Sequence, residues 1–307
     1  MYDVLGIGCC ALDIVMEVPH APAPDEKVRA ERLRIQGGGL VATALVAVAR
    51  LGGRCAFLGA LGDDVLAQRC FDELRREGVD VSHVRRVPGA SVLTAVIAAD
   101  RTAGTRMILW TDEEQPPTAP EQVTEDLVRA SRVLHIDNFQ VEAALRAAAL
   151  ARRLSVPVTV DLEPGGRPAD KLLRLVDYAI VPLEFARKQL GAGTLEDSAR
   201  TLYEAIRPHG GRAAVVTAGT AGSCAWTAAG AMRQAAYSVE VVDTTGCGDV
   251  FHGAFALGVA RGESLERIMP FAAAAAALKC RQPGGRAGIP TRGEVEVFLA
   301  SGPPVIE

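Results

Sequence analysis

The chain has 307 residues, of which 49% are apolar and 23% charged, and its formal net charge is -4. This balance supports a large core and suits one sizeable α/β domain with an appended subdomain. The basic residues are scattered and no segment approaches about 20 continuous apolar residues, which disfavours nucleic-acid binding and a membrane span. Seven cysteines without a Cys-x-x-Cys pair, and no secretory leader at the start, predict free thiols in the cytoplasm.

Short apolar runs alternate with amphipathic or alanine-rich stretches along most of the chain. The runs have the length of buried strands, and the stretches have the spacing of helices that cover a sheet. The alternation predicts a mostly parallel central sheet with helices on both faces. The expected strands are residues 4–7, 56–61, 133–136, 158–161, 179–181, 213–217 and 235–242. The expected helices are residues 41–51, 65–77, 141–154, 185–190, 195–207 and 265–280.

Two segments interrupt this alternation and predict a small β subdomain. Residues 13–36 hold three prolines and a strand-like run at 27–35, and residues 91–110 hold two apolar runs around a polar turn at 100–104. We expect four short strands that form a lid over a site on the main sheet; a hairpin without a role is the alternative. The predicted domains are an α/β core (1–12, 37–90 and 111–307) and a β lid (13–36 and 91–110).

The start of the chain contains a glycine pattern that suggests a dinucleotide site. Gly6, Gly8 and Ala11 match the spacing G-x-G-x-x-A after a predicted strand. That motif requires a helix to begin at the glycines, so that its amides meet the pyrophosphate. Residues 12–18 instead run as a strand that stops at Pro19, which disfavours a nicotinamide enzyme.

A glycine turn near residue 247 carries the clearest sign of chemistry. After the strand expected at 235–242, Gly246, Cys247 and Gly248 allow a tight turn, and the apolar residues at 250, 251, 254 and 255 predict a helix from Asp249. Unpaired amides at a helix start form an anion hole, with a carboxylate at its rim. Phosphoryl transfer needs such donors together with a base. An ordinary aspartate helix cap is the alternative.

Four motifs in chain order resemble those of the PfkB, or ribokinase-like, family of carbohydrate kinases. Residues 36–52 are similar to its first signature, 59–64 to its Gly-x-x-Gly-Asp-Asp element, 217–222 to its nucleotide loop and 243–255 to its second signature. Each motif is weak alone, but four in this order are specific, and they span essentially the whole chain. Residues 37–44, 251–254 and 277–290 look most like the ketohexokinase-like and sulfofructose-kinase branch.

The resemblance implies a ribokinase-like fold and ATP-dependent phosphorylation of a sugar hydroxyl. Its implied cofactors are ATP and Mg²⁺, with a monovalent cation such as K⁺ as a further candidate. The implied catalytic groups are Asp249 as base and the amides of Gly246, Cys247 and Gly248. The implied sugar contacts are Asp13, Gly38, Gly39 and Thr43. The implied nucleotide contacts are Thr217, Gly219, Gly222, Lys279 and Gly284. From the residues alone, Asp13 is equally a turn cap and Lys279 a helix-end charge.

The sequence departs from the family at the metal and sugar elements. Thr43 stands where the first signature often has asparagine, and the Asn-x-x-Glu element that organises magnesium is not intact at residues 182–185. Glu184 lies one position off, and Glu163 or Asp161 are the other magnesium candidates; a solvated surface carboxylate is the alternative for Glu184.

The sugar specificity is predicted only in part. Lys27 stands where the sulfofructose-kinase branch carries a lysine, whereas Trp110 and Asn138 take the positions of its other anion-binding groups. A sulfonate needs fixed cations or amides, so a neutral ketose or related sugar is as well supported as a sulfonated one. Trp110 as a core residue of the lid is the alternative to a substrate contact.

The sequence therefore predicts a cytoplasmic sugar kinase that forms a homodimer through its lid. No nucleic acid and no membrane are expected as partners. A nucleoside kinase of the same fold, and a sugar-binding regulator without turnover, are the alternative functions.

Overall fold

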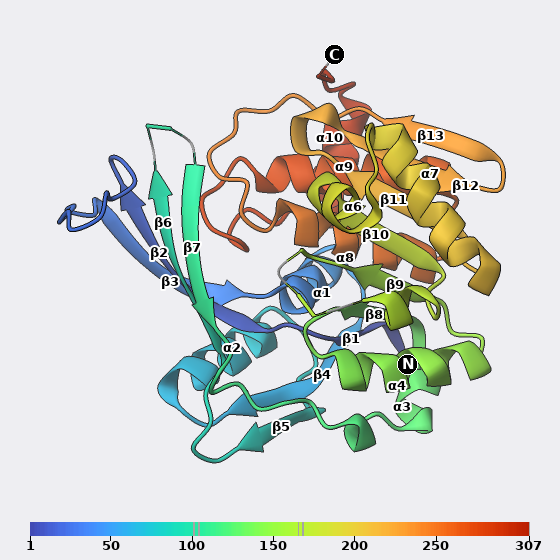
Figure 1. Ribbon diagram of the computed structural model, residues 1–307, viewed down its shortest axis with the longest axis horizontal. Coiled ribbons are helices and arrows are strands. Elements are labelled where there is room, and N and C mark those ends of the chain that lie inside the picture. The colour runs from blue at the N-terminus through green and yellow to red at the C-terminus, as the bar shows by residue number, and fades with distance from the viewer. Residues whose placement is uncertain (101, 104, 165, 168, 307) are drawn as a thin grey trace.

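A nine-stranded sheet forms the centre of the molecule (Figure 1). The computed structural model describes residues 1–100, 102–103, 105–164, 166–167 and 169–306. Within them the strand order is β13-β12-β11-β10-β9-β8-β1-β4-β5, parallel from β5 to β11 and antiparallel at β12 and β13. Its strands are β1 (Tyr2–Ile7), β4 (Cys55–Gly62), β5 (Val84–Val87), β8 (Ser131–Asp137), β9 (Val158–Asp161), β10 (Tyr178–Pro182), β11 (Ala213–Thr217), β12 (Ser223–Thr227) and β13 (Gly230–Gln234).

Helices cover both faces of this sheet, because neighbouring residues of each strand are apolar and point to opposite sides. Val4 packs into a core with α1, α8 and α9, whereas Leu5 packs into a second core with α4 and α7. No helix in the described ranges is both long and apolar enough to cross a membrane. The helices are α1 (Leu40–Arg50), α2 (Val65–Arg76), α3 (Glu125–Arg129), α4 (Val141–Arg153), α5 (Asp170–Leu173), α6 (Leu183–Leu190), α7 (Leu195–Ile206), α8 (Cys247–Ala260), α9 (Leu265–Lys279) and α10 (Arg292–Ala300), with 3₁₀ turns at Pro120–Gln122, Arg207–His209 and Gly219–Ala221.

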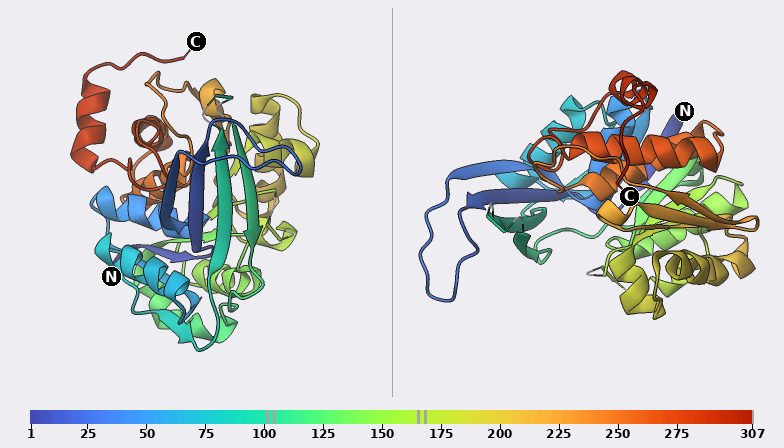
Figure 2. Two further views of the ribbon diagram at one scale, coloured as in Figure 1. Left: turned by 90° about the vertical axis from the view of Figure 1, so that its left-hand side faces the viewer. Right: turned by 90° about the horizontal axis from the view of Figure 1, so that it is seen from above.

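A four-stranded sheet stands out from one side of this body (Figures 1 and 2). Its order is β3-β2-β6-β7, with β2 parallel to β6 and the other pairs antiparallel. Its strands are β2 (Ala11–Val18), β3 (Arg32–Gly38), β6 (Leu93–Asp100) and β7 (Thr105–Thr111). Asp13 pairs with Gln36 and Ala95, and Ala95 pairs with Trp110, so these four side chains share one face, which we call the inner face.

The predicted fold class is confirmed: a mostly parallel sheet with helices on both faces and a small second sheet. The strand β2 also confirms that no helix follows Gly8. Two boundaries were wrong in small ways, because β3 begins at Arg32 rather than at residue 27 and α8 begins at Cys247 rather than at Asp249. In the predicted turn at 100–104, residues 101 and 104 lie outside the described residues.

The strand predicted at 235–242 was wrong. The antiparallel hairpin of β12 and β13 ends the sheet before it, and the following segment makes only an isolated bridge from Tyr237 to Val305. Ser238 N donates to Pro304 O and Ile306 N to Ala236 O, so the C-terminal residues take the hydrogen bonds that a strand would have used. Val241 and Val242 are therefore exposed, on a loop that leads to Gly246.

Candidate active site

The candidate residues gather at the carboxyl ends of the parallel strands. Asp137 ends β8, Asp161 ends β9 and Thr217 ends β11. The backbone of β1 leaves the main sheet at the same edge and continues into β2, and Cys9 N in this connection donates to Asp137 Oδ2 at 2.6 Å. Ligands of open α/β sheets bind at this edge, because loops and helix starts meet there. Asp137 follows a strand that the sequence predicts, and this rule would have singled it out.

The glycine turn before α8 presents free amides. Gly246 takes the left-handed conformation with φ 76°, and a Cβ there would lie 2.5 Å from Gly285 O, so only glycine fits. Among the described residues, the amides of Gly246 and Asp249 have no hydrogen-bond partner. Cys247 N donates to Thr244 O at 3.2 Å. This start of α8 has the donors of an anion site.

Asp249 lies at this helix start and is half-buried. Burial raises the pKa of its carboxyl well above the usual range; the negative charges of Glu163, Cys247 and Asp13 raise it further, and Arg286 opposes the shift. A carboxyl with a raised pKa is a stronger proton acceptor once it is ionised. The same interactions place Asp13, from the other sheet, within electrostatic reach of Asp249.

Asp13 lies on the inner face of the small sheet against the glycine run that precedes α1. Burial raises its pKa to about 6; the charge of Arg286 lowers it and that of Glu73 raises it. A Cβ at Gly38 would collide with the Asp13 carboxylate, and Gly39 has φ 90°. The predicted association of Asp13 with Gly38 and Gly39 is therefore present, and only glycine permits it.

Arg286 is a buried residue to which the sequence assigned no role. Its guanidinium donates to Gly38 O at 2.7 Å, to Thr43 Oγ1 at 3.2 Å and to Glu73 Oε1 at 3.0 Å. Glu73 Oε2 also accepts the Gly37 amide at 2.9 Å. The charge pair thus holds the glycine run beside Asp13. Nothing in the spacing of a Gly- and Pro-rich loop reveals a contact across more than 240 positions.

Arg106 is a second residue that the sequence did not single out. It belongs to β7 on the inner face, and its NH1 donates to Thr244 Oγ1 at 3.3 Å. Its charge lowers the pKa of Cys247 and of Glu163. With Arg32 and Arg34 it lines a cavity of ≈ 540 Å³ between the small sheet and the loop before α8. An arginine of the small sheet therefore lies over the predicted anion hole.

The structure places the other predicted sugar contacts in three different environments. Trp110 lies on the inner face, 47% exposed, with its ring edge-on to Phe139 at 5.9 Å. The Thr43 hydroxyl is buried against Arg286, so it reaches the site only through that arginine. Lys27 lies exposed on the loop between β2 and β3.

Asn138 lies in a different environment from the one the sequence implied. Its Nδ2 donates to Glu163 O and Arg167 O, both at 3.0 Å, and its Oδ1 accepts Glu163 N at 3.1 Å. Since the amide is fully engaged by this backbone, its role here is to hold the loop after β9. The sequence could not reveal this, because the partners follow Asn138 by 25 residues or more.

The predicted nucleotide contacts form two groups. Thr217, Gly219 and Gly222 lie at the end of β11, and both glycines have positive φ. Lys279 is fully buried, and its Nζ donates to Asp243 O at 2.8 Å. Gly284 N donates to Asp243 Oδ2 at 2.7 Å, and a Cβ at this position would collide with Gln36 of β3. Lys279 and Gly284 therefore brace the loop before α8.

The three magnesium candidates differ in their surroundings. Asp161 is buried beside His252, with Oδ1 3.4 Å from Nε2, and burial raises its pKa. The pKa of half-buried Glu163 is raised by burial and then by the charge of Glu184, an exposed residue 2.5 Å from Lys188. In the described ranges, no three His, Cys, Asp or Glu side chains are arranged to hold a metal ion.

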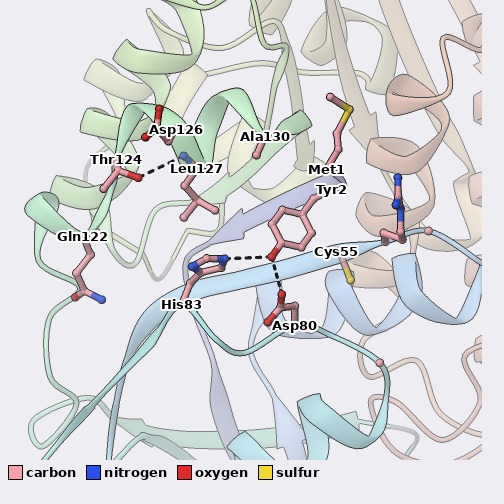
Figure 3. A pocket seen from close by; sticks show the side chains of 13 residues that line it. Met1, Tyr2, Cys55, Asp80, His83, Gln122, Thr124, Asp126, Leu127 and Ala130 are labelled. Atoms are coloured by element: carbon pink, nitrogen blue, oxygen red, sulfur yellow. Dashed lines mark hydrogen bonds between the residues drawn. The ribbon is translucent and has the colours of Figure 1, made fainter.

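A separate hollow of ≈ 790 Å³ lies at the opposite edge of the main sheet (Figure 3). Tyr2 and Cys55, which begin β1 and β4, line it, and the Tyr2 hydroxyl donates to Asp80 at 2.6 Å. None of the predicted site residues lines it. Because it faces the amino ends of the parallel strands, it is distinct from the candidate site.

Comparison with known proteins agrees with this geometry. The model of the pfkB family carbohydrate kinases matches residues 1–292. An ATP-dependent ribose-1-phosphate kinase of Halopiger xanaduensis is 29% identical, covering 98% of this chain and 99% of its own. A ketohexokinase of Mus musculus is 25% identical, covering 92% and 97%. The crystal structure of a putative ribokinase from Agrobacterium tumefaciens superposes with a TM-score of 0.87 at 30% identity, covering 97% of both chains. The chain belongs to the pfkB family of carbohydrate kinases.

Proposed function

We propose that Asp249 is the general base that activates a sugar hydroxyl for attack on the γ-phosphorus of ATP. One observation carries this proposal: the Asp249 carboxyl lies beside free amides at the start of α8 and within electrostatic reach of Asp13. The amides at this helix start, of which those of Gly246 and Asp249 are free, stabilise charge on the moving phosphoryl group, and Arg106 adds a cation above them. The hydroxyl proton passes to an Asp249 oxygen as the new O–P bond forms.

The sugar binds between the inner face and the glycine run. Asp13 accepts hydrogen bonds from sugar hydroxyls, and the backbone of Gly38 and Gly39 approaches the ring closely. The Trp110 ring bounds one side of the sugar site. Thr43 acts through Arg286, which positions Gly38. Lys27 contacts substrate only if the loop between β2 and β3 moves inward, and Asn138 shapes the neighbouring loop. The inner face covers the site and excludes water, which competes for the phosphoryl group.

ATP lies with its base and ribose along the loop at Thr217, Gly219 and Gly222 and its phosphates toward the start of α8. Lys279 and Gly284 hold the loop on which these phosphates rest.

The donor set fits Mg²⁺. Burial and then the charge of Glu184 raise the pKa of Glu163, and a hard divalent cation would relieve the repulsion between the two carboxylates. We assign Mg²⁺ to Glu163 and Glu184, with Asp161 behind them; when bound, it neutralises phosphate charge. K⁺ remains a candidate activator, tested by comparing turnover in KCl and in tetramethylammonium chloride.

A homodimer through the small sheet is part of the proposal. On the face opposite the inner face, which we call the outer face, large apolar side chains of all four strands are 37–63% exposed. They are Met16, Leu33, Val96, Met107 and Leu109. Exposed apolar sheet faces of this kind are normally covered by a partner. Seven free thiols fit a cytoplasmic location.

The test is Asp249→Asn in an ADP-release screen over ketoses, aldoses, sulfosugars and nucleosides. The variant should fold normally and lose at least ~10²-fold in kcat, the low end for a positioned base. Because the Asp249 pKa is raised, the wild-type acid limb of kcat/KM should lie above the ordinary aspartate range. Wild-type turnover in the variant would refute the assignment. Preference for a nucleoside would establish the nucleoside-kinase alternative. Thermal stabilisation by a ligand without ADP release would establish the alternative of a sugar-binding regulator without turnover.

A further inference from the structure

The inner face of the small sheet carries three arginines beyond the predicted sugar contacts. Alternate residues of a strand share a side, so the side chains of this face form rows about 7 Å apart. Asp13 belongs to one row, Arg34 to the next, and Arg32 and Arg106 lie at the two ends of the row after that. The arginines therefore begin one row from Asp13 and continue toward the free end of the sheet.

These three arginines line the cavity of ≈ 540 Å³ between the small sheet and the loop before α8. The floor between them is apolar and is formed by Val15, Ile97 and Ala99 of the two middle strands. The cavity reaches the row of Asp13 at Gly284, because a Cβ at that glycine would touch Gln36, which pairs with Asp13. The cavity is thus a cationic extension of the predicted sugar site.

Glu17 is the carboxylate that faces these cations on the same side of the sheet. Its Oε1 accepts Arg34 Nε at 3.1 Å and lies 3.0 Å from Arg34 Nη2, whereas its Oε2 is 4.0 Å from Arg32 Nε. Arg106 donates to Thr244 Oγ1 at 3.3 Å and, among the described residues, pairs with no carboxylate. Because the Arg34 and Glu17 side chains are only 28% and 18% exposed, an oxyanion beside them would be weakly screened by salt.

Two further acids line the cavity, and backbone amides hold both of them. Three amides donate to the Asp100 carboxylate, and two donate to that of Asp243. The Asp243 carbonyl also accepts the buried Lys279 ammonium at 2.8 Å. Counted with Lys279, the described charged groups at the cavity are four cations and three carboxylates, a net charge of +1. A ligand of opposite charge is therefore favoured.

We propose that this cavity binds a phosphate group that the sugar substrate already carries, so that the substrate is a sugar phosphate. Arg34 donates to the phosphate oxygens in competition with Glu17, the other two arginines add charge, and Asp13 holds hydroxyls of the same sugar one row away. A phosphate near neutral pH is largely a dianion and engages several guanidiniums, which match its oxygens. This substrate class rests on the proposed function: ATP gives its γ-phosphoryl group to a free hydroxyl, the hydroxyl proton passes to Asp249, and the products are ADP and a sugar bisphosphate.

The phosphates of ATP are the other anions that fit this chemistry. The arrangement favours the sugar, because the arginines share their face with Asp13 and Trp110, whereas the predicted nucleotide loop at 217–222 belongs to the main sheet. The groups that the sequence suggested for an anion on the sugar are placed otherwise: Lys27 is exposed on its loop, and backbone groups engage the Asn138 amide. The arginines take over that task.

The first experiment measures sugar binding by calorimetry on the whole protein without ATP, so that the result does not depend on turnover. The ligands are ribose, ribose 5-phosphate, fructose, fructose 1-phosphate, fructose 6-phosphate and a sulfonated fructose. We expect a phosphorylated sugar to bind at least ~10-fold more tightly than its neutral parent, the lower value for a hydrogen bond to a charged group. Equal affinities in every pair would refute the phosphate site, and tighter binding of the sulfonate would overturn the choice of phosphate.

Arg34→Gln and Arg233→Gln are the matched variants. Arg233 forms the same kind of pair, with Nε at 3.1 Å and Nη2 at 2.8 Å from Glu196 Oε2, but it lies on β13 and outside the cavity. Arg34→Gln should weaken binding of the sugar phosphate at least ~10-fold and leave the Kd of ATP as in wild type, and Arg233→Gln should change neither. Weaker ATP binding with unchanged sugar phosphate binding in Arg34→Gln would assign this arginine to the nucleotide and overturn the proposal.

Glu17→Gln tests the same site in the opposite direction. Without the competing carboxylate, Arg34 is free for the ligand, so the variant should bind the sugar phosphate more tightly than wild type does; weaker binding would contradict the site. The proposed base is judged separately. A fully active Asp249→Asn variant beside an intact preference for the phosphorylated sugar would refute the base alone, and a dead one beside equal affinities would refute the phosphate site alone.

Discussion

Ionisable side chains gather around the site although burial disfavours their charge. Burial raises the pKa of Asp13, Asp161, Glu163 and Asp249, and Arg286 is the cation that opposes the shift at Asp13 and Asp249. Ionised carboxylates that are short of partners destabilise the free protein. Sugar hydroxyls and a cation would supply the missing partners. Binding would therefore relieve the unfavourable free energy of burying these carboxylates, and this relief favours binding.

Asp13→Asn should stabilise the protein above pH 6 and weaken sugar binding. The folded pKa of about 6 lies above the unfolded value of 3.8, so the stability contributed by the protonated carboxyl is complete below about pH 4 and is lost as the pH rises through 6. Asparagine is neutral throughout, so the free energy of unfolding should rise by about 3 kcal/mol at pH 7.5. Urea unfolding measures it; a less stable variant at pH 7.5 would contradict the argument.

Arg286 and Glu73 should be energetically coupled. Breaking a buried ion pair leaves one charge without its partner, so Arg286→Ala and Glu73→Ala should each lower the free energy of unfolding by about 3 kcal/mol. The double variant should lose less than the sum, since neither charge then remains. Urea denaturation of the four proteins gives the coupling free energy. Additive losses would show that the pair does not act as a unit.

At the scale of elements, the start of α8 is the part that the proposed mechanism requires. Gly246 is needed for the turn itself, because its left-handed backbone and the nearby Gly285 carbonyl leave no room for a side chain. Gly248 is different: a Cβ there would meet no atom within 4 Å. The fold therefore does not require glycine at 248, but a ligand in that open space would.

Gly246→Ala and Gly248→Ala should separate stability from activity. Gly246→Ala should lose at least ~1 kcal/mol of stability, the lower cost of a left-handed alanine, together with most of its turnover. Gly248→Ala should keep its stability and still bind ATP less tightly, because its methyl group occupies the phosphate space. Thermal unfolding and nucleotide titration give the two readouts. Wild-type ATP affinity in Gly248→Ala would argue against phosphate at this position.

At the scale of the whole molecule, the small sheet has two faces with different tasks. Its inner face contributes Asp13, Trp110 and Arg106 to the site, and its outer face exposes apolar side chains. One sheet can serve both purposes because alternate residues point to opposite sides. Covering the outer face would also stiffen the sheet that holds Asp13.

Leu109→Lys should convert a homodimer into a monomer. Leu109 is 63% exposed on the outer face, and a buried lysine charge costs several kcal/mol at an interface. Val297→Lys is the matched control, since Val297 is 72% exposed on α10 rather than on the small sheet. Light scattering at micromolar protein should show a dimer for wild type and Val297→Lys. A monomeric wild type would contradict the predicted assembly.

The fold class could be predicted from local sequence patterns. The central strands were predictable because each is a short apolar run. The edge of the sheet that carries the candidate site was predictable because the motifs follow those runs. The glycine turn at 246 and the carboxylate at 249 were predictable for the same reason: the turn, the helix start and the proposed base lie within four residues. The strand expected at 235–242 failed because its apolar pattern does not reveal that the hairpin of β12 and β13 already ends the sheet.

What the sequence by itself determined is the fold class and the family, and it also predicted the turn and helix start proposed for phosphoryl transfer, since all of these depend on contiguous segments. Only the tertiary structure decided the rest. It assigned the Asn138 amide to a loop and the Lys279 amine to the Asp243 carbonyl, and it brought Arg286 and Arg106 to the site. These side chains reach partners from 25 to more than 240 positions away, and a contact of that kind is a property of packing that no local spacing encodes.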